Sequence, residues 1–118
     1  MDYPATFVST LLHSATNAHF MHFQTESYAE HKALQKYYEG ITELVDQFTE
    51  TYQGKNEKIK TYPDDFHLAK NPQRYLKSLC DFVKEIRQEL PQDSQLQNIV
   101  DEIAQLIDST LYKLRFLK

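Results

Sequence analysis

The sequence predicts an all-α fold, a four-helix bundle formed by a single domain over residues 1–118. The chain holds only two glycines and four prolines, so its elements are expected to be long and uninterrupted. Apolar residues recur at spacings of three and four in four separate segments, as on the buried face of a helix. A β-sandwich needs many turns and β-branched runs, and neither is found here.

The first helix is expected over residues 4–25. Asp2 can accept hydrogen bonds from the free amides of a helix start, and Pro4 has the φ angle that a first helical turn needs. One face of this helix is apolar and ends in two histidines, so we expect it to pack against the bundle. Its members are Phe7, Val8, Leu11, Leu12, Ala15, Ala18, His19 and His22.

The second helix is expected over residues 28–53. Ser27 and Glu30 have the spacing of a capping box, in which each side chain accepts from a backbone amide near the other residue. Gly54 is a suitable terminator at the other end. The expected buried stripe follows a near-heptad spacing and consists of His31, Leu34, Tyr38, Ile41, Val45, Phe48 and Tyr52.

Residues 55–70 form a long link without helical periodicity, whose apolar residues predict that it packs against the helices. The third helix is expected over 72–90, with Asn71 as its cap and Pro72 in its first turn. Short links on either side of one long link allow a crossover between the second and third helices. That wiring is typical of ferritin-like bundles.

The fourth helix is expected over residues 95–116, beginning at a second capping-box pattern formed by Ser94 and Gln97. Its apolar stripe has the same spacing of three and four as the other helices. The stripe consists of Leu96, Ile99, Val100, Ile103, Leu106, Ile107, Leu111 and Leu114.

The net charge of −4 and the scattered Lys and Arg residues argue against binding to nucleic acid, which needs a basic surface. Cys80 is the only cysteine, so no intramolecular disulfide can form. The chain shows neither a signal peptide nor an apolar segment long enough to span a membrane. A cytoplasmic location without membrane contact is therefore expected.

Four residues with metal-binding side chains, His19, His31, Asp46 and Glu50, follow one another at separations of 12, 15 and 4. His31 and Asp46 share one predicted helix, where 15 residues span more than about 20 Å. One chain therefore cannot bring all four residues to one ion. A common site needs a second copy across a two-fold axis, and the spacing predicts a homodimer if the site exists.

Two further residues, His22 and Glu26, lie on the same helical face as His19 and are weaker, peripheral candidates for metal ligands. No catalytic residue apart from the metal ligands is expected, and no organic cofactor site. A glycine-rich loop that could hold phosphates is absent.

The pattern His19-x(11)-His31-x(14)-Asp46-x(3)-Glu50, followed by Gly54, resembles the signature of the Dps family of mini-ferritins. The resemblance covers residues 7–54. It implies a ferritin-like fold and an iron site, or a site for another divalent metal, between two subunits. One subunit would supply the two histidines and its two-fold mate the two carboxylates. The implied activity is that of a ferroxidase, the oxidation of ferrous iron.

Two positions depart from the family pattern. Phe20 stands where these proteins usually have Trp, and Gln35 stands where they usually have a carboxylate. A neutral amide is a poorer iron ligand than a carboxylate. The short chain and the missing Lys-rich tail also argue against a twelve-subunit cage. The alternative function is therefore that of a catalytically inactive helical interaction or structural protein, for example a phage or mobile-element accessory protein.

Overall fold

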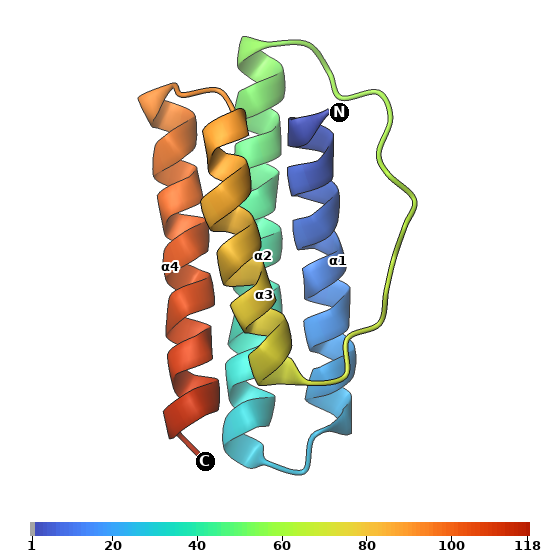
Figure 1. Ribbon diagram of the computed structural model, residues 1–118, viewed down its shortest axis with the longest axis vertical. Coiled ribbons are helices and arrows are strands. Elements are labelled where there is room, and N and C mark those ends of the chain that lie inside the picture. The colour runs from blue at the N-terminus through green and yellow to red at the C-terminus, as the bar shows by residue number, and fades with distance from the viewer. Residues whose placement is uncertain (1) are drawn as a thin grey trace.

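The computed structural model describes residues 2–118 and consists of four long helices (Figure 1). These are α1 (Tyr3–Gln24), α2 (Tyr28–Lys55), α3 (Pro72–Ile86) and α4 (Ser94–Phe116). A 3₁₀ turn, η1 (Arg87–Glu89), follows α3, and no strand occurs among the described residues. The predicted all-α class and the four helices are confirmed. Within the described residues, no helix combines the length and the apolar character that crossing a bilayer requires.

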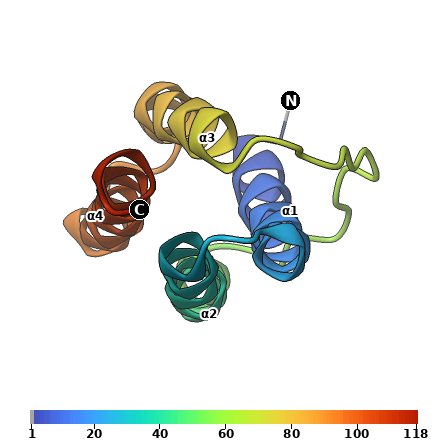
Figure 2. The same ribbon diagram turned by 90° about the horizontal axis from the view of Figure 1, so that it is seen from below.

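The helices form two antiparallel hairpins, α1–α2 and α3–α4, linked by residues 56–71 (Figure 1). This connection runs beside α1 from one end of the bundle to the other, so α2 and α3 point in the same direction. Seen along the bundle axis, α2 lies between α1 and α4, with α3 diagonally opposite (Figure 2). The α1–α2 turn, the start of α3 and the C-terminus therefore share one end of the molecule.

Three of the predicted helix starts are confirmed at the level of single hydrogen bonds. The side-chain oxygens of Asp2, Ser27 and Asn71 accept from the amide three residues further on, at 3.1, 3.2 and 2.9 Å. These bonds satisfy amides that have no partner within their own helix. Each of these three helices therefore begins where the local sequence predicts it.

The predicted stop at Gly54 is wrong. The helix α2 continues to Lys55, and no described residue has the positive φ angle that a terminating glycine adopts. Asn56 ends the helix instead, because its backbone N–H and its side-chain amide both donate to the carbonyl of Tyr52, at 2.9 and 3.1 Å. The side chain of Asn56 thus caps the end of α2, the role that was predicted for Gly54.

The predicted capping box at the start of α4 is also wrong. Asp93 is the N-terminal flanking residue and Ser94 already belongs to the helix. Gln97 points back to η1, where its Oε1 accepts from Arg87 and its amide donates to the carbonyl of Arg87, both at 3.1 Å. This side chain therefore joins α4 to the preceding turn and does not cap the start of α4.

The core lies between all four helices and is lined mainly by Leu, Ile, Val and Phe. Tyr37, rather than Tyr38, is the fully buried tyrosine of α2. Its hydroxyl lies 2.7 Å from the Oγ of Ser14, which itself donates to the carbonyl of Leu11 at 2.6 Å. Tyr37 therefore donates to Ser14, and burial raises the pKa of Tyr37 well above its usual value.

The connection is attached to the bundle by Asn17, a polar residue that is only 2% exposed. The side-chain amide of Asn17 donates to the carbonyl of His67 at 3.1 Å and to the hydroxyl of Tyr75 at 3.0 Å. Its side-chain oxygen accepts from the amide of Ala69 at 3.0 Å. One buried side chain thus links α1, the connection and α3.

Candidate functional site

The closest arrangement of predicted site residues is the pair His22 and His31, at the turn between α1 and α2. Nδ1 of His22 lies 2.8 Å from the carbonyl oxygen of His31, and Nδ1 of His31 lies 2.9 Å from the carbonyl oxygen of His22. The two rings stack with centroids 3.7 Å apart and planes 19° apart. Because a carbonyl can only accept, both Nδ1 atoms carry hydrogen and donate.

This pairing follows from where the two histidines lie in their helices. His22 belongs to the last turn of α1, where carbonyl groups have no amide partner within the helix. His31 belongs to the first turns of α2 and supplies the missing donor across the turn. The stacked histidine pair, which is formed by His22 and His31, therefore closes the end of the α1–α2 hairpin.

His19 has a different environment from His31. It lies on the exposed side of α1, and its ring stacks on Tyr38 with centroids 4.1 Å apart and on Phe23 with centroids 4.8 Å apart. The ring centroids of His19 and His22 are 5.9 Å apart. The structure therefore pairs His31 with His22, which was predicted only as a peripheral metal ligand. The other peripheral candidate, Glu26, is exposed in the turn between α1 and α2.

Asp46 and Glu50 lie exposed on α2, far from the histidine pair. Because α2 is continuous from Tyr28 to Lys55, the 15 residues between His31 and Asp46 span about 22 Å. Over residues 2–118 of one chain, no three His, Cys, Asp or Glu side chains are grouped as a metal site requires. The predicted four-residue set is therefore not assembled within a single chain.

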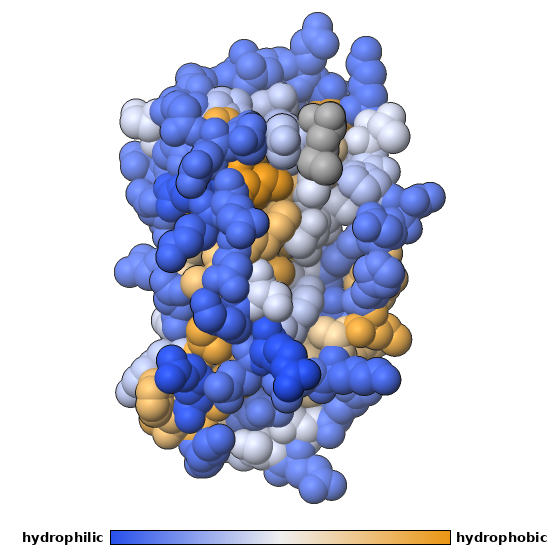
Figure 3. Space-filling view, viewed as in Figure 1, coloured by the Kyte–Doolittle hydropathy of each residue, from blue (hydrophilic) through white to orange (hydrophobic). Residues whose placement is uncertain are grey.

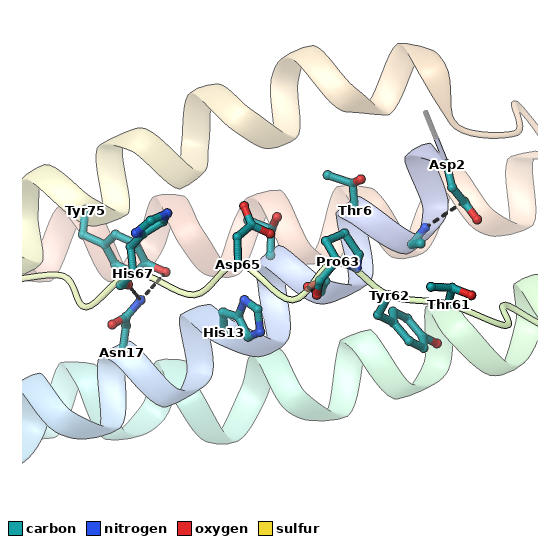
Figure 4. Close-up of a pocket in the computed structure, with 13 residues that line it drawn as sticks. Asp2, Thr6, His13, Asn17, Thr61, Tyr62, Pro63, Asp65, His67 and Tyr75 are labelled. Carbon is teal, nitrogen blue, oxygen red and sulfur yellow. Dashed lines mark hydrogen bonds between the residues drawn. The ribbon is translucent and has the colours of Figure 1, made fainter.

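A groove of about 680 Å³ runs between α1 and the connection (Figure 4). Thr6, His13 and Asn17 of α1 line one side, and Asp65 and His67 of the connection line the other. The ring of His13 packs edge-on against Phe66, with centroids 4.9 Å apart, and Asn17 holds the connection in place. Asp2 caps α1 at one end of the groove, while the side chains of Ser9 and Asn17 bond to backbone groups of the connection and attach it.

Sequence reasoning overlooked the feature that distinguishes α1 most clearly from the other helices. No Asp, Glu, Lys or Arg occurs between Asp2 and Glu26, although 25% of all residues in the chain are charged. Five exposed residues of α1 nevertheless follow one another at helical spacing, and we refer to them as the outer face of α1. They are Leu12, Thr16, His19, Phe20 and Phe23. The long uncharged run was the signal that could have revealed this face.

The three large apolar residues of the outer face are Leu12, Phe20 and Phe23, which are 39%, 46% and 68% exposed. By contrast, the face over α3 and the connection is largely hydrophilic, with apolar side chains visible in a narrow strip and in small patches (Figure 3). Apolar side chains that are exposed singly are common in soluble proteins, but a whole helical face without charge is not. The outer face of α1 is therefore the second candidate site.

Comparison with known proteins places this chain in a family. The family DUF5856, described as a family of unknown function, matches residues 22–114. A relative from Enterobacteria phage T4, described as an uncharacterized 14.6 kDa protein in the mobD-ri intergenic region, is 27% identical over 110 residues. The alignment covers 92% of this chain and 84% of that protein. No solved structure matches.

These findings overturn the resemblance to the Dps family, because the family that matches most of the chain is a different one. The spacing of His19, His31, Asp46 and Glu50 was too short a pattern to identify a family. In the structure, the histidine that pairs with His31 is His22, which the pattern does not include. The match over residues 22–114 shows instead that the chain belongs to DUF5856.

Proposed function

We propose that this chain is a small helical phage accessory protein that acts by binding another protein chain through the outer face of α1. The phage origin of the T4 relative supports the phage assignment. The exposed, uncharged side chains of α1 support a role in protein binding, and this single observation carries the proposal. The alternative expected from the sequence, an interaction protein without catalytic activity, is thus the function we favour.

The outer face of α1 has the composition of the central part of a protein interface. Its large residues are apolar or aromatic, and charged residues are missing, which is the pattern that distinguishes interface centres from ordinary surface. Covering Phe20 and Phe23 would remove apolar area from water, at about 25 cal/mol per Å². Phenylalanine is among the aromatic residues that are enriched in protein interfaces relative to the rest of the surface.

Three histidines of the α1–α2 hairpin support the same proposal, because the contacts of the structure give His19, His22 and His31 a structural use. The Nδ1 atoms of His22 and His31 hold the turn, and the ring of His19 packs on Tyr38. A ring nitrogen that donates its hydrogen to a carbonyl has no lone pair left for a metal ion, so the Nδ1 atoms of His22 and His31 serve the turn.

A site-specific photocrosslinking experiment tests this proposal. The photoreactive amino acid p-benzoylphenylalanine replaces Phe23 on the outer face, and in a matched control it replaces Glu85, an exposed residue of α3. We expect irradiation of cells that produce the chain to crosslink the position of Phe23, but not that of Glu85, to a discrete protein. If neither position gave crosslinks, or if both gave the same products, the proposed function would be wrong.

A further inference from the structure

The two halves of the bundle carry opposite net charge. The half that contains the α1–α2 turn comprises residues 14–41, 67–79 and 106–118 (Figure 1). It holds eight of the 13 basic residues but only four of the 17 acidic residues. Its net charge is therefore +4, while the other half has a net charge of −8. We refer to the first of these as the basic half.

A groove of about 630 Å³ lies between α2 and α4 in the basic half. Lys32 and Lys36 of α2 and Lys113 of α4 line it, and Glu39 is the single acidic residue of its lining. Burial and the neighbouring Lys36 ammonium lower the pKa of Lys113, so these two positive groups lie close together. Within residues 2–118, no ion pair joins any of the three lysines to a carboxylate. The positive charge of the groove is therefore available to a ligand.

A second groove, of about 600 Å³, lies between α3 and α4 at the same end of the bundle. Arg74 and Lys77 of α3 and Arg115 of α4 line it, and its lining contains no acidic residue. Lys77 forms an ion pair with Asp81 at 2.9 Å, so the two arginines supply the uncompensated charge here. Because α4 lies between α2 and α3 (Figure 2), the two grooves flank the last turns of α4.

Two exposed aromatic side chains, Tyr112 and Phe116, lie on α4 between the two grooves. They are 54% and 60% exposed, and their ring centroids are 5.7 Å apart. Each is two residues away from the buried Leu114, which is about 200° around the helix, so both rings face away from the core. The guanidinium of Arg115 lies 4.9 Å from the centroid of Phe116. The end of α4 thus presents aromatic rings with a basic groove on either side, and we call this region the α4 surface.

We propose that the α4 surface binds single-stranded nucleic acid, with phosphates in the two grooves and bases stacked on Tyr112 and Phe116. Proteins that hold single strands combine positively charged grooves with exposed aromatic rings in this way. Bases also stack on the planes of arginine side chains, which is how Arg115 contributes. A duplex suits the surface less well, because its bases are already stacked on one another and cannot reach the rings.

The acidic net charge of the whole chain is compatible with this proposal, because the charges are separated along a bundle that is 43 Å long. The centres of the two halves are thus about 20 Å apart. At physiological salt, interactions between exposed charges are largely screened beyond about 8 Å. The basic residues come from three helices, so they are scattered in the sequence and come together only in the fold.

This inference goes beyond the proposed function, because it concerns a different face of the molecule. The helix α2 lies between α1 and α4 (Figure 2), and neither basic groove is lined by a residue of α1. Binding at the α4 surface therefore leaves the outer face of α1 free for a protein partner. The two proposals can be tested separately.

Fluorescence anisotropy of a labelled oligo-dT of about 16 nucleotides, titrated with the purified full chain, tests the proposal. We expect saturable binding at low salt that weakens as the salt concentration rises, because phosphate contacts release counterions. The variant K36E/K113E should bind on the order of tenfold or more weakly, with a flatter salt dependence. The control variant K58E/K60E carries the same charge change in the connection, outside the basic half, and should bind like the wild type.

The contribution of the rings is tested with Y112A/F116A, which should also weaken binding on the order of tenfold or more, because base stacking is lost. The salt dependence of this variant should match that of the wild type, since its charges are unchanged. Tyr62→Ala removes an exposed ring of the connection and serves as the control. Circular dichroism melts verify that every variant is folded. The duplex of oligo-dT with oligo-dA should bind less tightly than oligo-dT alone.

Lack of saturable binding at low salt would overturn the proposal. Equal binding by Y112A/F116A and the wild type would also overturn it, as would competition by polyglutamate as strong as that by unlabelled oligo-dT, since either result indicates a general anion site. A comparison with oligo-rU shows which nucleic acid is preferred, and tighter binding of either strand supports the proposal. The proposed function depends instead on crosslinks from Phe23, so each proposal can fail while the other holds.

Discussion

His22 and His31 each donate their Nδ1–H to the backbone carbonyl of the other, at 2.8 and 2.9 Å, with their rings stacked at 3.7 Å. The pair closes the α1–α2 hairpin from both sides of its turn. Two side chains that a metal site would use as ligands thus have a structural role. Stability measurements can distinguish this structural role from metal binding.

Replacing either histidine of the stacked pair should destabilise the fold. His31→Ala leaves the carbonyl of His22 without a donor, and we expect the free energy of unfolding to fall by about 1–3 kcal/mol. His22→Ala should cost a similar amount, and the double variant should cost less than the two single losses added together. Urea denaturation gives all three values. His67→Ala, on the exposed connection, serves as the control and should change stability little.

Ferrous iron should not stabilise the chain. A ligand that binds the native state raises the melting temperature to an extent set by its affinity and concentration. We expect the melting temperature under anaerobic conditions to be the same with and without ferrous iron. An increase with iron that disappears in the D46A/E50A variant would instead show that Asp46 and Glu50 bind metal.

Asn17 should be essential for holding the connection against α1. Asn17→Ala removes partners from the carbonyl of His67, the hydroxyl of Tyr75 and the amide of Ala69. We expect a loss of about 2–4 kcal/mol, since these polar groups would lose their partners at a partly buried site. Hydrogen exchange at the amide of Ala69 should become faster. Asn98→Ala, at an exposed position of α4, should leave both the stability and this exchange rate unchanged.

Tyr37 should make the fold sensitive to alkaline pH. Burial raises the pKa of Tyr37 above that of an exposed tyrosine, which is about 10. Below pH about 10 both states keep the phenol proton, so stability does not depend on this group. Above it the unfolded chain loses the proton while the folded chain keeps it, and the free energy of unfolding falls. Urea melts from neutral to alkaline pH should show a shallower decline for Tyr37→Phe than for the wild type.

The sequence predicted correctly those features of the structure that depend on residues close together in the chain. Asp2, Ser27 and Asn71 each cap a helix through an amide only three residues away, so short patterns were sufficient to find them. Tyr37 and Tyr38 could not be separated in the same way, because both continue a spacing of three or four from Leu34. Only the packing of α1 against α2 places Tyr37 inside.

The candidate site was harder to predict, because it depends on how two helices meet. His19 and His22 lie one turn apart on α1, and the spacing alone does not show which of them faces His31. The geometry of the turn selects His22. The distance argument for His31 and Asp46 did hold, because helix length depends only on the number of residues between them. Family membership, in contrast, could not be judged from four positions.

The lack of charge in α1 also has a consequence for the order of folding. During synthesis α1 leaves the ribosome before α2, within a run of 23 consecutive residues without a Lys, Arg, Asp or Glu side chain. Such a segment is prone to aggregate until an amphipathic partner covers it. Because α2 follows after a three-residue link, that partner is the next segment to emerge. The α1–α2 hairpin can thus form from local contacts while α3 and α4 are still being made.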